Sequence, residues 1–232
     1  MTRRAAALAL LGALSLTTTP AAAGDAQAVD VGLVLAVDVS GSVSEDRYRL
    51  QMSGIAAAFE DRSVQAAILS GPRRALAITL VQWSDKPQIS IPWTVLASPG
   101  DALAFAAKVR EAPRLASAFT CMSRMMRFVA DKVLPRIPVQ ADRTVVDVSG
   151  DGHDNCNPAT PVDAVRDELA AGLITINGLP ILEGDEAESL APWYRDHVIG
   201  GVGAFLLPAS GFRDFGRAIR QKFITEVSAL PR

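Results

Sequence analysis

The sequence has 232 residues, of which 49% are hydrophobic, and its formal net charge is −2 at neutral pH. A chain of this size and composition suits one domain with a substantial core, and no linker or internal repeat divides it. The balance is mildly acidic and the basic residues are scattered. This gives no reason to expect a nucleic acid or an anionic membrane as a partner.

The amino terminus has the pattern of a secretory signal peptide. Arg3 and Arg4 supply positive charge, residues 5–16 are small or apolar, and Ala21-Ala22-Ala23 offers a small-residue cleavage site, with an alternative after residue 28. The apolar run is shorter than the roughly 20 residues of a membrane-spanning helix. No cysteine lies near the cleavage site to carry a lipid anchor. We therefore expect residues 1–23 to be removed, and residues 29–232 to form a periplasmic or secreted domain without a membrane anchor.

The first half of the expected domain alternates between strand and helix patterns. Residues 29–37 are almost wholly apolar and rich in β-branched side chains, which predicts a strand buried on both faces. A helix is expected from Ser44, a suitable cap, because apolar residues recur after it at helical spacing. Residues 74–84 and 88–96 predict two strands joined by a short polar turn, which is typical of an antiparallel pair at a sheet edge. Residues 98–111 predict the next helix.

The second half continues the alternation. Short apolar stretches predict strands at residues 143–148, 173–178 and 204–207, and helical spacing predicts helices at residues 122–134, 161–171, 186–197 and 211–228. Strands that alternate with helices favour an α/β fold. We expect a doubly wound, mostly parallel central sheet with one antiparallel edge strand and helices on both faces.

Two polar segments follow predicted strands. Asp38, Ser40 and Ser42 come directly after the first strand, at a spacing that keeps side chains on one side of an extended chain, and Gly41 permits a tight turn. Asp151 lies between two glycines after a later strand. Ligands of an open parallel sheet bind outside the carboxyl ends of its strands, so these side chains are expected to converge. All of them offer oxygen, which suits Mg²⁺, Mn²⁺ or Ca²⁺ better than zinc or copper.

At these residues the sequence resembles a known family. Asp38-x-Ser40-x-Ser42, after a hydrophobic strand and before an amphipathic helix, resembles the first loop of the metal-ion-dependent adhesion site (MIDAS) of von Willebrand factor A (VWA) domains. Asp151-Gly152 resembles the third loop, and Thr120 is the candidate for the second. The likeness covers nearly all of residues 29–232. In particular, the sequence is similar to the uncharacterised secreted bacterial branch of the family, where Val-Asp-Val-Ser-Gly-Asp-Gly and a closing helix rich in Arg-Ala-Ile-Arg occur.

The resemblance implies a divalent metal, Mg²⁺ or else Mn²⁺ or Ca²⁺, bound directly by Ser40, Ser42 and Thr120. Asp38 and Asp151 would act through water or hydrogen bonds. An acidic residue of a protein partner would complete the octahedron, so the implied function is metal-dependent protein binding without catalysis. The residues expected beside this ligand are Gly41, Gly152, His153 and Asp154.

The second loop departs from the family pattern, since it reads Ala-Ser-Ala-Phe-Thr-Cys and lacks the usual glycine. Ser117 or Ser123 could therefore replace Thr120 as the ligand. If the second and third loops face one metal, Cys121 and Cys156 lie on adjacent loops. A disulfide between them is expected in an exported chain, and it would hold the two loops together.

Two other classes of function stay open. One is an interaction or scaffold domain of the cell envelope that needs no metal and ignores a chelator. The other is a Mg²⁺-dependent phosphoryl-transfer enzyme that uses Asp38 and Asp151. Against the enzyme, Ser40 replaces the second acid of a nucleophile-type Asp-x-Asp, and the Gly-x-Ser-x-Gly of serine hydrolases does not occur. Nothing in the sequence sets the oligomeric state, and non-enzymatic protein binding is the favoured interpretation.

Overall fold

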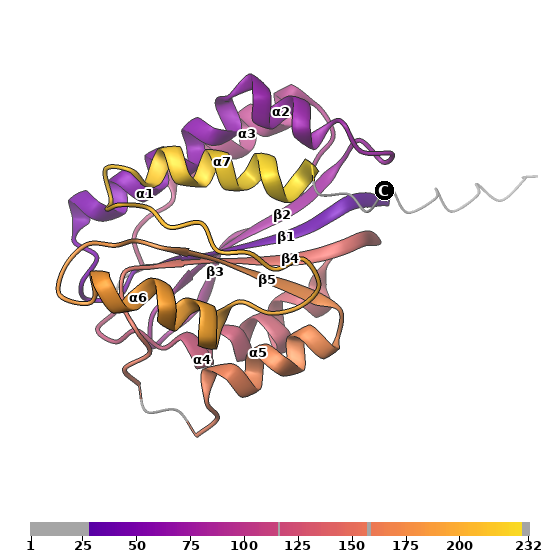
Figure 1. The fold of residues 1–232 in the computed structure, drawn as a ribbon. Coiled ribbons are helices and arrows are strands. Elements are labelled where there is room, and N and C mark those ends of the chain that lie inside the picture. Colours follow the sequence, from indigo (N-terminus) through magenta and orange to yellow (C-terminus); the bar gives the residue numbers. More distant parts are fainter. Residues whose placement is uncertain (1–27, 116, 157–158, 229–232) are drawn as a thin grey trace, which may run out of the picture.

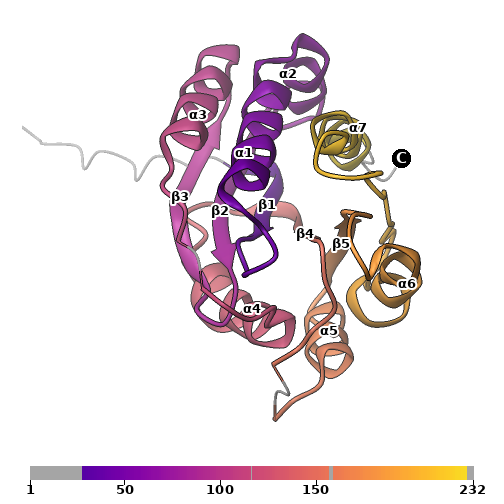
Figure 2. The same ribbon diagram turned by 90° about the vertical axis from the view of Figure 1, so that its left-hand side faces the viewer.

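The computed structural model describes residues 28–115, 117–156 and 159–228. The expected export signal, residues 1–23, lies outside them. The described chain has three layers, with helices on both faces of a central sheet (Figures 1 and 2). The α/β fold class expected from the sequence is confirmed. Within the described ranges, no helix is both long and apolar enough to cross a membrane.

The sheet has five strands in the order β3-β2-β1-β4-β5. The central strand β1 (Val29–Asp38) lies parallel to β2 (Leu76–Trp83) on one side and to β4 (Ala141–Gly150) on the other. β5 (Ile174–Pro180) pairs in parallel with β4, and β3 (Gln88–Leu96) is the antiparallel edge strand beside β2. Every residue of β1 and β2 is buried, which is why their sequences are apolar without alternation.

Helices cover the two faces of the sheet unequally (Figure 2). One face carries α1 (Glu45–Glu60), α2 (Arg62–Ile68), α3 (Pro99–Glu111) and α7 (Phe215–Ser228), and the other carries α4 (Met122–Phe128), α5 (Val162–Ala171) and α6 (Ala187–Trp193). Side chains cap the first three: Ser44 accepts from Arg47 N–H, Asp61 from Ser63 N–H and Ser98 from Asp101 N–H. Asp61 also ends the preceding helix, so one long helical stretch becomes two.

Some elements differ from the sequence expectation. Residues 204–207 are not a strand of the sheet, because Leu206 and Ala209 make only isolated bridges beside β5. The N–H groups of Leu207 and Ala209 do donate to Gly178 O and Pro180 O, as in a parallel pair. The ladder is interrupted because Pro180 has no N–H to donate in return and because the Asn177 side chain accepts the N–H of Phe205. The closing helix begins later than expected, at Phe215. Helices α4 and α6 pass into π-helical turns, Val129–Val133 and Tyr194–Val198, and a short 3-10 turn (Leu134–Arg136) ends the first.

The core lies on both sides of the sheet. Under α1, α3 and α7 the rings of Phe59, Phe105 and Phe223 meet, with centroids 4.9 and 5.0 Å apart. Under α4 to α6, the three methionines of α4 are fully buried and belong to the core. The carboxyl ends of β1 and β4 are thus held between two packed layers, and the loops that follow them are placed by rigid elements.

Candidate metal centre

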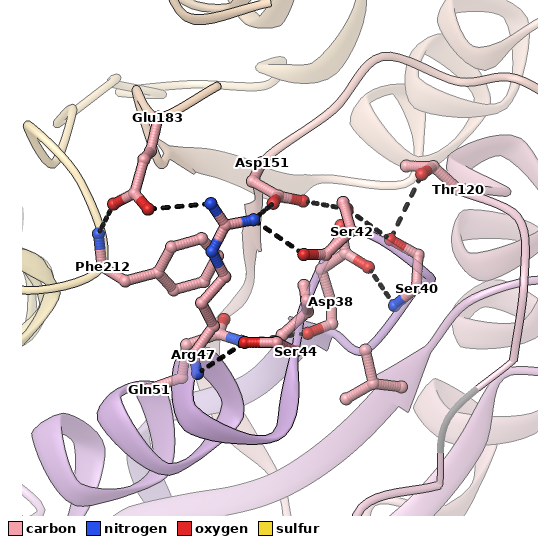
Figure 3. Close-up of polar contacts among 12 residues, drawn as sticks. Asp38, Ser40, Ser42, Ser44, Arg47, Gln51, Thr120, Asp151, Glu183 and Phe212 are labelled. Carbon is pink, nitrogen blue, oxygen red and sulfur yellow. Dashed lines mark hydrogen bonds and ion pairs between the residues drawn. The ribbon is translucent and has the colours of Figure 1, made fainter. Parts of the chain in front are cut away.

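Three loops meet at the carboxyl ends of β1 and β4 (Figure 3). The first loop follows Asp38, the last residue of β1, and the third follows Gly150, the last residue of β4. The second loop precedes α4. Since β1 and β4 are adjacent and parallel, their carboxyl ends share one edge of the sheet.

The first loop is a tight turn fixed by hydrogen bonds. Asp38 is fully buried, and its Oδ1 accepts from Ser40 N–H at 2.7 Å. Gln51 of α1 donates its side-chain amide to the carbonyl of Asp38 at 3.1 Å. The N–H of Gly41 donates to Ala118 O at 3.1 Å, and a Cβ at Gly41 would lie 2.9 Å from that oxygen. Glycine is needed there because the second loop approaches so closely.

A chain of hydroxyls and a carboxylate connects the three loops (Figure 3). Thr120 Oγ1 donates to Ser40 Oγ at 3.3 Å, Ser40 Oγ lies 3.3 Å from Ser42 Oγ, and Ser42 Oγ donates to Asp151 Oδ1 at 2.6 Å. Asp38 is connected to this chain by the hydrogen bond that its Oδ1 accepts from the Ser40 N–H. The structure therefore brings together all five residues that the sequence pattern singled out.

Of the three hydroxyls considered for the second loop, Thr120 is the one beside Ser40. Ser123 Oγ instead donates to Thr160 O at 2.5 Å. Ser117 interacts with Asp85, where it is the main cause that lowers the pKa of that carboxyl group. Thr120 is also tied to the third loop: its N–H donates to Asn155 Oδ1 at 2.9 Å, and Asn155 N–H donates back to Thr120 O at 3.0 Å. The missing glycine therefore does not displace this threonine.

Cys121 and Cys156 form the expected disulfide, with their Cα atoms 5.2 Å apart. It joins the second loop to the third. Asp154, expected beside the ligand, supports this junction: its Oδ2 accepts from Ser123 N–H at 3.0 Å and its Oδ1 from Cys156 N–H at 3.2 Å. His153 does line the cavity in front of the centre, and its ring packs against Trp193 with centroids 5.0 Å apart.

Arg47 of α1 is a site residue that sequence reasoning missed. Its Nη1 donates to Ser42 O at 2.7 Å and lies 3.6 Å from Asp151 Oδ2, and its Nη2 donates to Glu183 Oε1 at 2.8 Å. The guanidinium also packs on the Phe212 ring, 4.9 Å from its centroid. The available signal was position: Arg47 lies in the first turn of the helix after the motif, and Glu183 follows the carboxyl end of β5.

Sequence reasoning also missed Arg114, whose guanidinium contacts the backbone of the first loop. Its guanidinium donates to the backbone carbonyls of Ser40, at 3.1 Å, and of Val43. These bonds satisfy carbonyls that the tight turn leaves without partners in a helix or a sheet. Arg114 therefore fixes the backbone and Arg47 faces the open side.

The open side is a cavity of about 230 Å³ with a negative lining. The residues that line it are Ser42, Arg47, Thr120, Asp151, Gly152, His153, Asn155, Glu183, Gly184, Asp185 and Glu186. Burial, and after it the charge of Asp151, raises the pKa of Asp38 to about 7, and burial raises the pKa of Asp151. The lining itself contains four acidic side chains, those of Asp151, Glu183, Asp185 and Glu186, and one arginine, and this excess of acidic groups attracts a cation.

The donor set fits a hard divalent cation. Neighbouring ligands of an octahedral Mg²⁺ lie about 2.9 Å apart at its usual bond lengths, and those of a six-coordinate Ca²⁺ about 3.4 Å apart. The hydroxyl oxygens of Thr120 and Ser40, and those of Ser40 and Ser42, lie 3.3 Å apart, within this range. The shorter distance of 2.6 Å, from Ser42 Oγ to Asp151 Oδ1, is a hydrogen bond to an acid that positions the serine. Asp38 Oδ2, buried and without a hydrogen-bond partner among the described residues, is a further acceptor. The described residues contain no metal-binding cluster of three or more His, Cys, Asp or Glu, since serine and threonine supply most of these oxygens.

A family model described as "protein of unknown function (DUF1194)" matches residues 28–231. No curated protein matches the chain at a significant level. Solved structures with the same fold include proximal thread matrix protein 1 from the mussel byssus, at a TM-score of 0.62 and 14% identity. A second structure of that mussel protein, with a zinc-occupied MIDAS motif, matches at 0.60 and 14%. Both alignments cover 88% of this chain and 47% of the mussel chain, so this chain spans about half of its structural relative's length.

Proposed function

Since this chain belongs to the DUF1194 family and is a VWA-type domain, we propose that it is an exported, non-catalytic module that binds a protein partner through a divalent metal. The metal site is built from Asp38, Ser40, Ser42, Thr120 and Asp151. Mg²⁺ is the first candidate, and Mn²⁺ or Ca²⁺ the next.

The observation that carries this proposal is the continuous chain from Thr120 through Ser40 and Ser42 to Asp151. Three loops separated in sequence converge there, and a disulfide and a pair of reciprocal hydrogen bonds hold two of them in place. Such preorganisation of oxygen atoms beside buried carboxylates is what a metal site needs and what a simple structural turn does not.

Each side chain has a distinct role in this proposal. Ser40, Ser42 and Thr120 hold the metal, while Asp38 and Asp151 position the serines and supply negative charge. When bound, the metal supplies a positive point of attachment for a carboxylate of the partner. The acids of the cavity rim, such as Glu183 and Glu186, repel that same carboxylate when the cation is absent. Binding would therefore depend on the metal as well as on an acidic residue.

The environment and the relatives support a binding role outside the cytoplasm. The disulfide suits an oxidising compartment, in agreement with the signal-peptide pattern of residues 1–23. The mussel relative is a thread matrix protein with a MIDAS motif that holds zinc in one structure, which supports metal binding on this fold and adds zinc to the metals worth testing.

Isothermal titration calorimetry with Mg²⁺, Mn²⁺, Ca²⁺ and Zn²⁺ tests the proposal. We expect saturable binding of at least one of the first three to the wild-type protein, and none to the double variant Ser40→Ala/Ser42→Ala. Ser44→Ala is the matched control, because it removes a hydroxyl from the same loop that faces the helix backbone. Far-UV circular dichroism of each variant checks the fold.

Two outcomes would count against the proposal. If no metal binds the folded wild-type protein, or if partner capture is unaffected by a chelator, the chain is a metal-independent interaction domain. If the protein hydrolyses a generic phosphate ester and Asp38→Ala abolishes that activity, the module is an enzyme.

A further inference from the structure

A second group of ionisable side chains is buried between β4 and α7, away from the metal centre. It consists of Asp147 on β4 and of Lys222 and Glu226 one turn apart on α7. Their side chains are 2%, 0% and 0% exposed. Lys222 Nζ lies 2.7 Å from Asp147 Oδ1 and 2.5 Å from Glu226 Oε1. One amine therefore contacts two carboxyl groups in the protein interior.

The surroundings are mostly apolar and do not satisfy Asp147. The Phe205 ring lies beside the amine, with its centroid 4.9 Å from Lys222 Nζ. Asn177, opposite Asp147 in the sheet register, donates to Glu226 Oε1 at 2.7 Å. Asp147 Oδ1 has its ion-pair contact with Lys222, but neither oxygen of Asp147 has a well-aligned hydrogen-bond partner among the described residues. A buried ion pair that stabilises a fold normally has its remaining lone pairs satisfied, and this one does not.

The charges of the three groups do not balance. A lysine cation with two carboxylates leaves one net negative charge among the three buried groups, which is costly. Arg143 on β4 is near enough to interact with Glu226, but it is only partly buried. Burial, and after it the charge of Glu226, raises the pKa of Asp147 to about 7. Transfer of the lysine proton to a carboxylate leaves a neutral amine beside an un-ionised carboxyl group. That is the pairing in which an amine is a nucleophile and a carboxyl group is an electrophile.

We propose that Lys222 and Asp147 are joined by an intramolecular amide bond, formed by the folded protein itself with Glu226 as the group that transfers the protons. The Lys222 Nζ lone pair attacks Cγ of the un-ionised Asp147 carboxyl group. The Glu226 carboxylate takes a proton from the nitrogen and delivers it to the departing hydroxyl. A C–N bond replaces a C–O bond, one water molecule leaves, and Glu226 returns to its starting state. The step involves no change of oxidation state and no cofactor.

Proximity is what makes this reaction feasible without an activated acid. Groups held in contact by a fold react as if at effective concentrations of roughly 10⁵–10⁸ M, and the reacting atoms of a near-attack arrangement lie about 3 Å apart. Lys222 Nζ lies 2.7 Å from Asp147 Oδ1, the oxygen bonded to Cγ, so the amine is already beside the carbon that it would attack. The neutral amide is also cheaper to bury than the ions it replaces. The product would fasten the closing helix α7 to the central sheet, independently of any metal.

The mass of the intact folded protein is the first measurement. We expect it to be lower, by one water molecule, than the mass given by the sequence of the purified chain with its disulfide. After reduction and digestion with trypsin, the peptide of residues 144–166 should be found linked to the peptide of residues 221–232. Lys222 lies inside that second peptide and escapes cleavage because its amine is blocked.

Three results would overturn the assignment. One is an intact mass equal to that of the sequence with its disulfide, together with unlinked peptides and tryptic cleavage after Lys222. Another is a water loss confined to the peptide of residues 144–166, because a succinimide at Asp151-Gly152 has the same mass change. The last is a loss of ammonia with a link to the peptide of residues 167–195, which would make Asn177 the electrophile.

Variants test the role of Glu226. Glu226→Gln should keep the linked peptide from forming, whereas the exposed acid Glu188, changed to Gln, should leave it intact. A substitution at a buried residue can also impair folding, so a second experiment uses wild-type protein that is recovered from inclusion bodies in denaturant. It should have the full mass before refolding and lose water afterwards. A link in the chain that has never folded, or in Glu226→Gln, would show that the buried cluster does not drive the reaction.

Discussion

Arg47 places a permanent positive charge beside the candidate metal centre, 3.6 Å from Asp151 Oδ2. A divalent cation at the same oxygens would meet that charge. We therefore expect Arg47→Gln to bind Mg²⁺ or Mn²⁺ about tenfold more tightly, a gain of roughly 1.4 kcal/mol from the removed repulsion. Calorimetry at constant ionic strength measures it.

The matched control is Arg49→Gln on the same helix, whose guanidinium pairs with Glu45 and Asp46 in solvent. It should leave metal affinity unchanged. Weaker binding in Arg47→Gln would mean that the guanidinium acts mainly by holding Ser42 and Glu183 in place.

Gly150, at the end of β4, leaves room for three side chains that support the centre. A Cβ at this position would lie 2.8 Å from Tyr194 Oη, 2.9 Å from Asp38 Oδ2 and 3.1 Å from Trp83 Cζ2. All three side chains are buried, so Gly150→Ala forces a shift in the packed layer beneath the metal site. We expect a loss of about 1–3 kcal/mol in the free energy of unfolding, together with weaker metal binding.

Urea titration gives the free energy of unfolding for this variant. Gly100→Ala is the control, since a Cβ there would meet only Ser98 Oγ at 3.6 Å, and it should be neutral or slightly stabilising. Wild-type stability in Gly150→Ala would show that the space around Asp38 is not tightly packed.

The sequence identified the residues of the candidate site that sit at strand ends. Asp38, Ser40 and Ser42 follow a buried strand at a regular spacing, and Asp151 follows another, so the rule for parallel sheets places them on one edge. Arg47 and Glu183 escaped because they reach the site with long side chains from other elements. Spacing along the chain gives no information about such contacts, which depend on how α1 packs beside the loop after β5.

The disulfide is the main covalent tie between two elements of the site. It links the second and third loops across a sequence separation of 35 residues. By loop-closure entropy alone, its removal in Cys121→Ser/Cys156→Ser should lower the free energy of unfolding by about 3–4 kcal/mol. Metal affinity should fall as well, because Thr120 and Asp151 are then held together only by hydrogen bonds such as those of Asn155.

Urea unfolding and calorimetry on the double variant measure the two effects. The wild-type protein treated with a reductant should behave like the variant. Unchanged metal affinity in both would assign the disulfide a purely structural role, remote from the geometry of the ligands.

Element prediction succeeded where burial alone decides the pattern. Residues 29–37 were expected as a strand buried on both faces and form β1, Val29–Asp38, in which every residue is buried. The prediction of a strand at residues 204–207 failed, because there a side chain competes with the backbone: Asn177 accepts the N–H of Phe205, which a sixth strand would use for pairing. The π-helical turns after α4 and α6 were not expected from the spacing of apolar residues. A proline stands beside each turn, Pro135 after the first and Pro192 before the second, and proline removes a donor from the helical hydrogen-bond pattern.

At the scale of the whole molecule, the candidate metal centre joins segments that lie far apart in the chain. Thr120 Oγ1 bonds to Ser40 Oγ across 80 residues, and Ser42 to Asp151 across 109. A ligand that requires all of these oxygens in place binds only the folded state, because the unfolded chain cannot assemble them. Metal binding should therefore stabilise the entire domain and not one loop.

The expected size of this effect follows from mass action. Metal at one hundred times its dissociation constant adds about 2.7 kcal/mol to the free energy of unfolding. For a domain of this length, that corresponds to a rise of roughly 5–10 °C in the melting temperature. Differential scanning calorimetry with Mg²⁺, at an ionic strength matched with NaCl, measures the shift, and a chelator should reverse it. In Ser40→Ala/Ser42→Ala the melting temperature should not respond to the metal. An equal rise in that variant would trace the effect to general screening of the acidic surface, because the variant lacks the hydroxyls on which the specific site depends.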